Sequence, residues 1–132
     1  MPFIKLALDD AKEPEPVGEG MYDLRITKAQ DTESKKGNPM TVITIRVEDA
    51  GIKNPSPIVH YMTYPDEDLP DEQKNFRLLD IKRFLSVFGI PFDPHGFDTD
   101  GLVGATGRAM VIQEEGQDNI MRNKLRLPRL KE

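Results

Sequence analysis

The sequence predicts an all-β protein with one helix, in which five strands are interrupted by the helix between the third and the fourth. Three observations predict this class. Apolar and polar residues alternate in "MYDLRITKAQ" and "MTVITIRVEDAG", which is typical of half-buried strands. One stretch alone, "DLPDEQKNFRLLDIKRFLSVFGIP", changes to apolar steps of three and four. Glycines recur within "LVGATGRAMVIQEEG", as they do where a sheet bends.

The first three strands follow one another directly. The first two each present one apolar face, and a third β-rich run, "SPIVHYMTYP", is closed by Pro65. The apolar positions are Tyr22, Leu24 and Ile26 in the first strand, and Ile43, Ile45 and Val47 in the second. Because side chains alternate across a strand, these residues are expected to face a common core.

The helix is expected over residues 70–88. Its apolar stripe consists of Leu78, Ile81, Leu85 and Phe88, with Phe84 beside them. Asp68 or Asp71 is expected to cap its start, and Gly89 followed by Pro91 is a stop signal. If this stripe is in the core, Leu85→Asp abolishes the cooperative melting transition, because a buried charge has no partner there.

Two further strands, in "LVGATGRAMVIQEEG" and "NIMRNKLRLPRL", complete the order. Five strands with a helix after the third is the connectivity of an OB-fold, a small, partly open barrel in which the helix plugs one end. The expected interior includes Leu24, Ile26, Ile43, Ile45 and Val111. The acidic, Pro- and Gly-containing start predicts a flexible arm over residues 1–20, followed by one domain over residues 21–132.

Composition excludes several classes of protein. The 132 residues carry a formal charge of −5 and contain no cysteine, which excludes disulfides, thiolate metal sites and cysteine nucleophiles. Residues 1–20 sum to −3 and residues 65–72 to −5, so the rest of the chain is slightly basic, at +3. His60 and His95 lack a paired ligand set, and "GLVGATGR" lacks the Lys-Ser/Thr pair of a P-loop. We therefore expect no metal, no cofactor and no enzymatic activity.

Membrane and export signals are missing from the pattern as well. The apolar run in "MPFIKLALDDAKEPEPVGEG" is too short for a signal peptide or a membrane span. The expected location is the cytoplasm, without a membrane partner.

The loops of an OB-fold point to a ligand. Such folds bind across strands 2 and 3, between the loop joining strands 1 and 2 and the loop joining strands 4 and 5. The first loop is expected at residues 28–40 and the second at residues 114–119. Cations hold phosphates and aromatic rings stack on bases in single-strand binding. The candidate nucleic-acid-binding residues are Lys28, Lys35, Lys36, Asn38, Arg46, Tyr61, Tyr64, Arg108, Arg122 and Lys124.

The chain also resembles a known group of proteins. The segments "YDLRITKAQDTESKKGNPMTVITIRVEDAG", "RLLDIKRFLSVFGIPFD", "LVGATGRAMVIQEEG" and "NKLRLPRL" resemble small phage and prophage proteins encoded near recombination and replication genes. Some of these are single-stranded DNA-binding proteins with an OB-fold. The resemblance implies binding of single-stranded DNA without strict sequence preference, in the host cytoplasm, with replication or recombination proteins as further partners. It does not extend to an acidic C-terminal tail, since this chain ends "LRLPRLKE".

Each feature also has a plainer interpretation. "KKGN" is equally typical of a solvated hairpin turn in which Gly37 supplies the positive φ. Tyr61 and Tyr64 could pack at the rim of the core, and Arg122 and Lys124 could protect an exposed strand edge. The alternative function is an OB-type protein-interaction module, such as a recombination adaptor or a virion component, which the acidic charge and the lack of tryptophan favour. Pairing of edge strands across a homodimer is left open.

Overall fold

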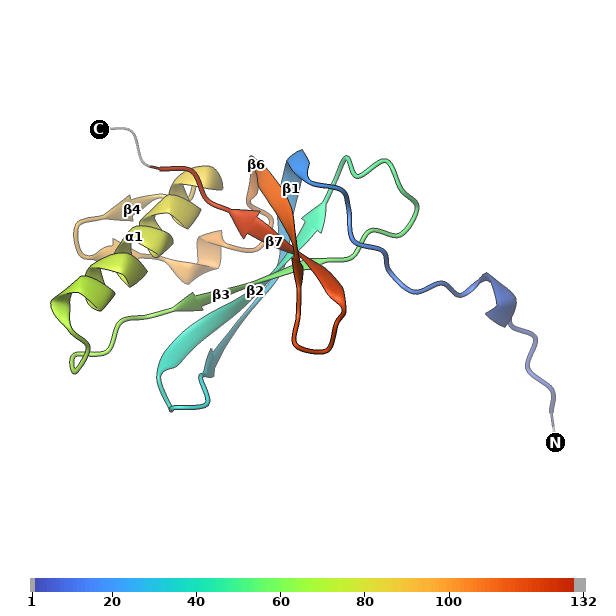
Figure 1. Ribbon diagram of the computed structural model, residues 1–132, viewed down its shortest axis with the longest axis horizontal. Helices are drawn as coiled ribbons and strands as arrows, with labels where there is room; N and C mark the ends of the chain where they lie inside the picture. The colour runs from blue at the N-terminus through green and yellow to red at the C-terminus, as the bar shows by residue number, and fades with distance from the viewer. Residues whose placement is uncertain (1, 130–132) are drawn as a thin grey trace.

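Five antiparallel strands form one sheet in the computed structural model, which describes residues 2–129 (Figure 1). The order is β3-β2-β1-β6-β7, from β1 (Gly20–Glu33), β2 (Pro39–Val47), β3 (Ile58–Thr63), β6 (Thr106–Glu115) and β7 (Met121–Arg126). The helix α1 (Asp71–Val87) lies between β3 and β6 in the sequence, and is followed by a small hairpin of β4 (Phe92–Asp93) and β5 (Gly96–Phe97). Single 3-10 turns occur at Leu8–Asp10 and Thr99–Gly101. The predicted class, mostly β with one helix after the third long strand, is confirmed.

The two edge strands of the sheet, β3 and β7, lie near each other. Each consecutive pair in the order is joined by an antiparallel ladder, but no ladder joins β3 to β7 within residues 2–129. The sheet is therefore strongly curved without being closed by hydrogen bonds.

The core lies on the concave side of this sheet. All five residues predicted to face the interior are buried, together with neighbours from every long strand and from α1. Those five are Leu24, Ile26, Ile43, Ile45 and Val111, each 0% exposed. Burial of a large aliphatic side chain stabilises the fold by about 1.5–3 kcal/mol, so these positions account for much of the driving force.

The helix contacts the core through its C-terminal half only. Phe84, Leu85 and Phe88 are buried, whereas Leu78 is 53% exposed. The prediction that Leu78 belongs to the buried stripe is therefore wrong, because the first turns of α1 extend beyond the strands. The predicted aspartate cap is wrong as well, since Pro70 occupies the N-cap and no side chain caps the helix.

Gly107 in β6 is required by the end of this helix. A Cβ atom at residue 107 would lie 2.3 Å from the carbonyl oxygen of Val87, a clash with backbone that no rotamer relieves. The glycine-containing strand thus lets the end of α1 lie directly on the sheet, which is one reason for a glycine inside a strand.

Part of the N-terminal segment is tied to the sheet. Val17 is 1% exposed, its N–H donates to Oδ1 of Asn123 at 2.7 Å, and Gln113 Nε2 donates to the Val17 carbonyl at 2.8 Å. Glu15 forms an isolated parallel bridge with Pro55. These contacts lie within residues 1–20, where the sequence predicts a flexible arm. The sequence gives little sign of them, because one valine between prolines and glycines has no periodicity.

Within the described part of the chain, no helix is long and apolar enough to cross a membrane.

Candidate nucleic-acid interface

The β1–β2 hairpin is longer than the sequence predicts. Residues 28–33 and 39–40, expected in a loop, belong to β1 and β2, and only residues 34–38 connect the strands. The register shifts between Ile26 and Lys28, so Thr27 is the extra residue of a bulge, and its hydroxyl donates to the Thr44 carbonyl at 3.3 Å. The predicted loop boundary is wrong because residues 28–33 are polar apart from Ala29, which packs against the core, so the sequence shows no alternation of apolar and polar residues there.

A tight turn at the hairpin tip exposes two lysines. Gly37 has φ of 82°, the Ser34 N–H donates to the Asn38 carbonyl at 2.7 Å, and the Asn38 N–H donates to the Ser34 hydroxyl at 3.1 Å. Lys35 and Lys36 are exposed. The hairpin-turn interpretation of "KKGN" describes the backbone correctly, and it leaves both ammonium groups in solvent, where they can contact a ligand.

The part of the convex side of β1, β2 and β3 that lies between the bulge at Thr27 and the hairpin turn contains no acidic residue, whereas Asp23 lies on the same side of β1 before the bulge. Cross-strand partners share a face, and the register gives three rows whose members point away from the core. The rows are Lys28–Thr44–Val59, Gln30–Val42–Tyr61 and Thr32–Met40–Thr63. We call these nine residues the outer face. The candidate nucleic-acid-binding residues predicted from the sequence did not include Met40, Val42 or Val59. Alternation with Ile43 and Ile45 nevertheless indicates that Val42 points outward.

The two candidate tyrosines have different surroundings. Tyr61 is on the outer face and is 61% exposed, so its ring is available for stacking. Tyr64 is half-buried against the core, and its hydroxyl shares a hydrogen bond of 2.6 Å with the Thr41 hydroxyl, which in turn donates to Asp31 Oδ1. Of the two rings, the structure brings only Tyr61 onto the face that also holds Lys28.

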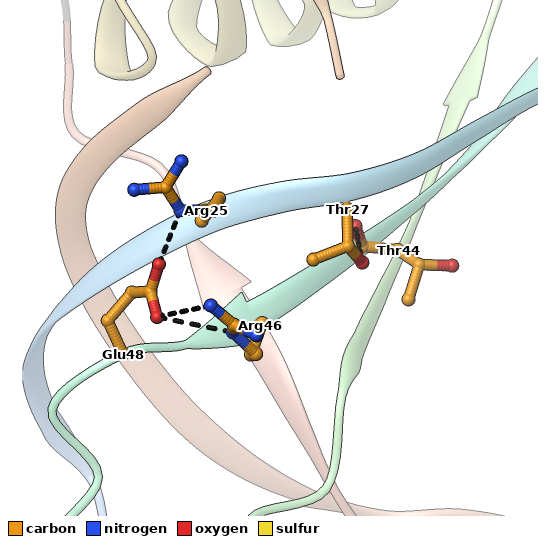
Figure 2. A network of polar contacts seen from close by, with 5 residues as sticks. All are labelled: Arg25, Thr27, Thr44, Arg46 and Glu48. Atoms are coloured by element: carbon orange, nitrogen blue, oxygen red, sulfur yellow. Dashed lines mark hydrogen bonds and ion pairs between the residues drawn. The ribbon is translucent and has the colours of Figure 1, made fainter. Parts of the chain in front are cut away.

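Arg46 is held by a neighbouring carboxylate at the far end of β2. Figure 2 shows Arg46 and Arg25, from adjacent strands, directed at the two oxygens of Glu48, with Arg46 Nη2 2.9 Å from Glu48 Oε2. The hydrogen bond from Arg25 is the main cause of a lowered Glu48 pKa. Arg46 lies about eight residues from the hairpin tip, roughly 26 Å at about 3.3 Å per residue, so the predicted grouping with Lys35 and Lys36 is not formed.

Arg108 is separated from the other candidates. Its guanidinium lies 2.9 Å from Asp23 and 3.4 Å from Asp49, and these contacts, chiefly the hydrogen bond to Asp23, raise its pKa. It lies near the start of β6, whereas the second ligand loop, expected at residues 114–119, is at the other end of that strand, which ends at Glu115. Arg108 therefore belongs to a different surface.

A groove of about 450 Å³ lies between the edge strands β3 and β7. Tyr61 lines it from β3, and Arg122 and Lys124 line it from β7, so the structure brings these three candidates together. Asp80 and Glu114 line it too, which balances its formal charge. Lys124 pairs with Glu114 at 3.4 Å.

Arg122 in this groove is paired with an acid from its own hairpin. It binds Asp118 through two nitrogens, at 2.6 and 3.0 Å, and this contact lowers the pKa of Asp118 to about 2. Both side chains are about half exposed, and exposed ion pairs contribute only about 0–1 kcal/mol. A phosphate could therefore replace Asp118 at small cost.

His60, which neighbours Tyr61 on β3, is directed inward. Its ring stacks on Phe84 with centroids 4.7 Å apart, and burial is the main cause of its lowered pKa. A neutral, packed imidazole of this kind supports the contact between β3 and α1 and offers no charge to a ligand.

Among residues 2–129, no three histidine, cysteine or acidic side chains are grouped closely enough to hold a metal ion.

The candidate cations divide into two sets by their ion pairs. Lys28, Lys35 and Lys36 have no ion pair within the described residues. The other set, in which each residue has an ion pair, consists of Arg46, Arg108, Arg122 and Lys124.

No protein-family model matches this chain, and no curated protein matches it.

Proposed function

We propose that this chain is a non-enzymatic single-stranded DNA-binding protein built on a partly open OB-type barrel, which coats unpaired strands during phage replication or recombination. The strand order supports the barrel, because β3 and β7 lie side by side at the opening and α1 follows the third strand. In such folds the second and third strands carry the ligand, and here these are β2 and β3.

The observation that carries the proposal is the composition of the outer face. In a chain with 23 acidic residues, this face has none, and it combines an exposed tyrosine with apolar and hydroxyl side chains. Single-strand binding without sequence preference needs a ring for stacking and cations along the backbone path. Tyr61 supplies the ring, and Lys28, Lys35 and Lys36 supply the cations.

The lysines extend the face along the hairpin. Lys28 is in the row next to Tyr61, and Lys35 is seven residues further, roughly 23 Å at about 3.3 Å per residue. A bound strand would stack on Tyr61 and follow β1 and β2 to the tip, with its phosphates near the three ammonium groups. Arg122 and Lys124 would contact the strand from the β7 side of the β3–β7 groove, where phosphates would replace their carboxylate partners Asp118 and Glu114.

The experiment is a fluorescence anisotropy titration with labelled oligo-dT at several salt concentrations. The three lysines alone predict a log–log slope of about −2 on single strands, and the contacts of Arg122 and Lys124 bring it to about −3.5. The triple variant K28Q/K35Q/K36Q is expected to lose most of this slope, whereas K5Q/K12Q/K53Q, which removes the same charge elsewhere, is expected to retain it. Duplex DNA that binds more tightly than oligo-dT would overturn the proposal.

The ion pairs of the other candidates favour a second function, an OB-type protein-interaction module acting as a recombination adaptor or virion component. Four of the seven candidate cations have an acidic partner, and the chain is acidic overall. A module of this kind predicts no anisotropy change with oligo-dT at low salt, or a salt slope near zero.

A further inference from the structure

A groove rich in arginine lies outside the outer face and the β3–β7 groove. It has a volume of about 560 Å³ and is lined by four of the chain's eight arginines, Arg83, Arg108, Arg126 and Arg129. No acidic residue lines it. Such a concentration of guanidinium groups is unexpected in a protein of charge −5, since like charges at close range repel one another unless an anion lies between them.

Three elements meet to form this groove. Arg108 and Arg126 come from β6 and β7, Arg83 comes from α1, and Arg129 belongs to the segment after β7, which runs back toward the helix (Figure 1). Its apolar lining consists of Met21, Ala109, Met110, Leu127 and Pro128. Arginines around an apolar floor suit a ligand that has both phosphates and flat, weakly polar rings.

The arginines of the groove are available to a ligand. Within residues 2–129, only Arg108 of the four has an ion pair, with Asp23 and Asp49. The Nε atom of Arg83 is buried and has no hydrogen-bond partner in the same part of the chain. A buried donor without a partner is costly, and an oxygen of a bound anion would satisfy it.

A row of cations connects this groove to the β3–β7 groove. Arg122, Lys124 and Arg126 alternate along β7 and therefore point to the same side of the strand. Arg122 and Lys124 line the groove that contains Tyr61, and Arg126 lines the arginine groove. The distance along β7 from Arg122 to Arg126 is roughly 13 Å, so one flexible polyanion can reach both grooves.

We propose that the arginine groove is a second binding site for the phosphate backbone of the same DNA strand, which passes from Tyr61 over β7 to Arg126, Arg83 and Arg129. This inference rests on the proposed function. It assigns a longer site to the protein than the outer face alone provides, with bidentate arginine–phosphate contacts at its end. The bases at this end would lie against Met21, Met110 and Leu127.

The test compares two lengths of labelled oligo-dT, about 8 nucleotides and about 20 nucleotides, which lie within and beyond the usual span of one OB-fold site, about 4–16 nucleotides. The variant R126Q/R129Q removes two exposed arginines and leaves the core untouched. It is expected to bind the longer oligomer about tenfold more weakly at low salt and to lower the salt slope by about 1.4, that is about 0.7 for each lost contact. Its binding of the shorter oligomer is expected to equal that of the native protein.

The control K5Q/K53Q removes the same charge from exposed positions outside both grooves, and it is expected to behave as the native protein does. If R126Q/R129Q binds both oligomers like the native protein, or weakens both equally, the second site does not exist, while the proposed function stands. If the native protein binds neither oligomer, the proposed function fails, and this inference fails with it. Poly-glutamate serves as a probe for an acidic protein segment. If R126Q/R129Q loses binding to poly-glutamate while it binds both DNA oligomers like the native protein, the groove binds an acidic protein segment and the proposal is overturned.

Discussion

Replacement of Tyr61 by alanine tests the role of the outer face. The side chain is 61% exposed and makes no side-chain hydrogen bond within residues 2–129, so its removal is expected to leave folding almost unchanged. Stacking of one base on an aromatic ring contributes about 1–3 kcal/mol. Tyr61→Ala is therefore expected to weaken oligo-dT binding by about 5- to 150-fold. The salt slope is expected to stay the same, because the ring makes no contact that releases counterions.

The assay is anisotropy with labelled oligo-dT, paired with a thermal melt of each variant. Tyr61→Phe keeps the ring and is expected to bind like the native protein. Tyr64→Phe is the matched control: it loses the hydroxyl bonded to Thr41, so stability is expected to fall by about 1 kcal/mol while DNA affinity is retained. If Tyr61→Ala binds with native affinity, or if Tyr64→Phe loses as much affinity as Tyr61→Ala, then the Tyr61 ring does not stack on a base.

Three further changes have defined outcomes. Asp118→Asn releases Arg122 from its carboxylate, so oligo-dT affinity measured by anisotropy is expected to rise, and an unchanged or lower affinity would count against Arg122 as a phosphate contact. His60 has a pKa lowered from 6.5 by burial, so the folded state disfavours its protonation and the melting temperature is expected to fall as pH drops below about 6.5; the same fall in His60→Phe would assign it to other groups. Gly107→Ala places a methyl group against the Val87 carbonyl. It is expected to lower the free energy of unfolding, measured by urea denaturation, by about 1–3 kcal/mol. An unchanged denaturation midpoint would show that α1 can move away from β6.

The sequence predicts the core better than it predicts the site. Leu24, Ile26, Ile43 and Ile45 are recognised because burial of one sheet face imposes a period of two on the residues. The pattern fails at residues 28–33, where Ala29 is the one apolar residue and the inward-facing positions are otherwise polar. A period of two is therefore visible in the sequence only where one face of a strand is filled by large apolar residues.

The electrostatics of the site depend on contacts that the sequence does not contain. Arg108 meets Asp23 across 85 residues, and Arg46 shares Glu48 with Arg25 only because their strands are in register. The spacing of charges along the chain gives no sign of the first pair. For the same reason the sequence does not reveal the arginine groove, which forms only when α1 and the segment after β7 meet.

Ultraviolet cross-linking of a short oligo-dT to the native protein, followed by mass spectrometry of the joined peptides, locates the bound nucleotides on the protein surface. If unpaired nucleotides lie on the outer face of β1, β2 and β3, the principal cross-link is expected at Tyr61, and it should disappear in Tyr61→Ala. Cross-links confined to the first turns of α1 or to the β4–β5 hairpin, with none on β2 or β3, would show that DNA does not bind on the outer face.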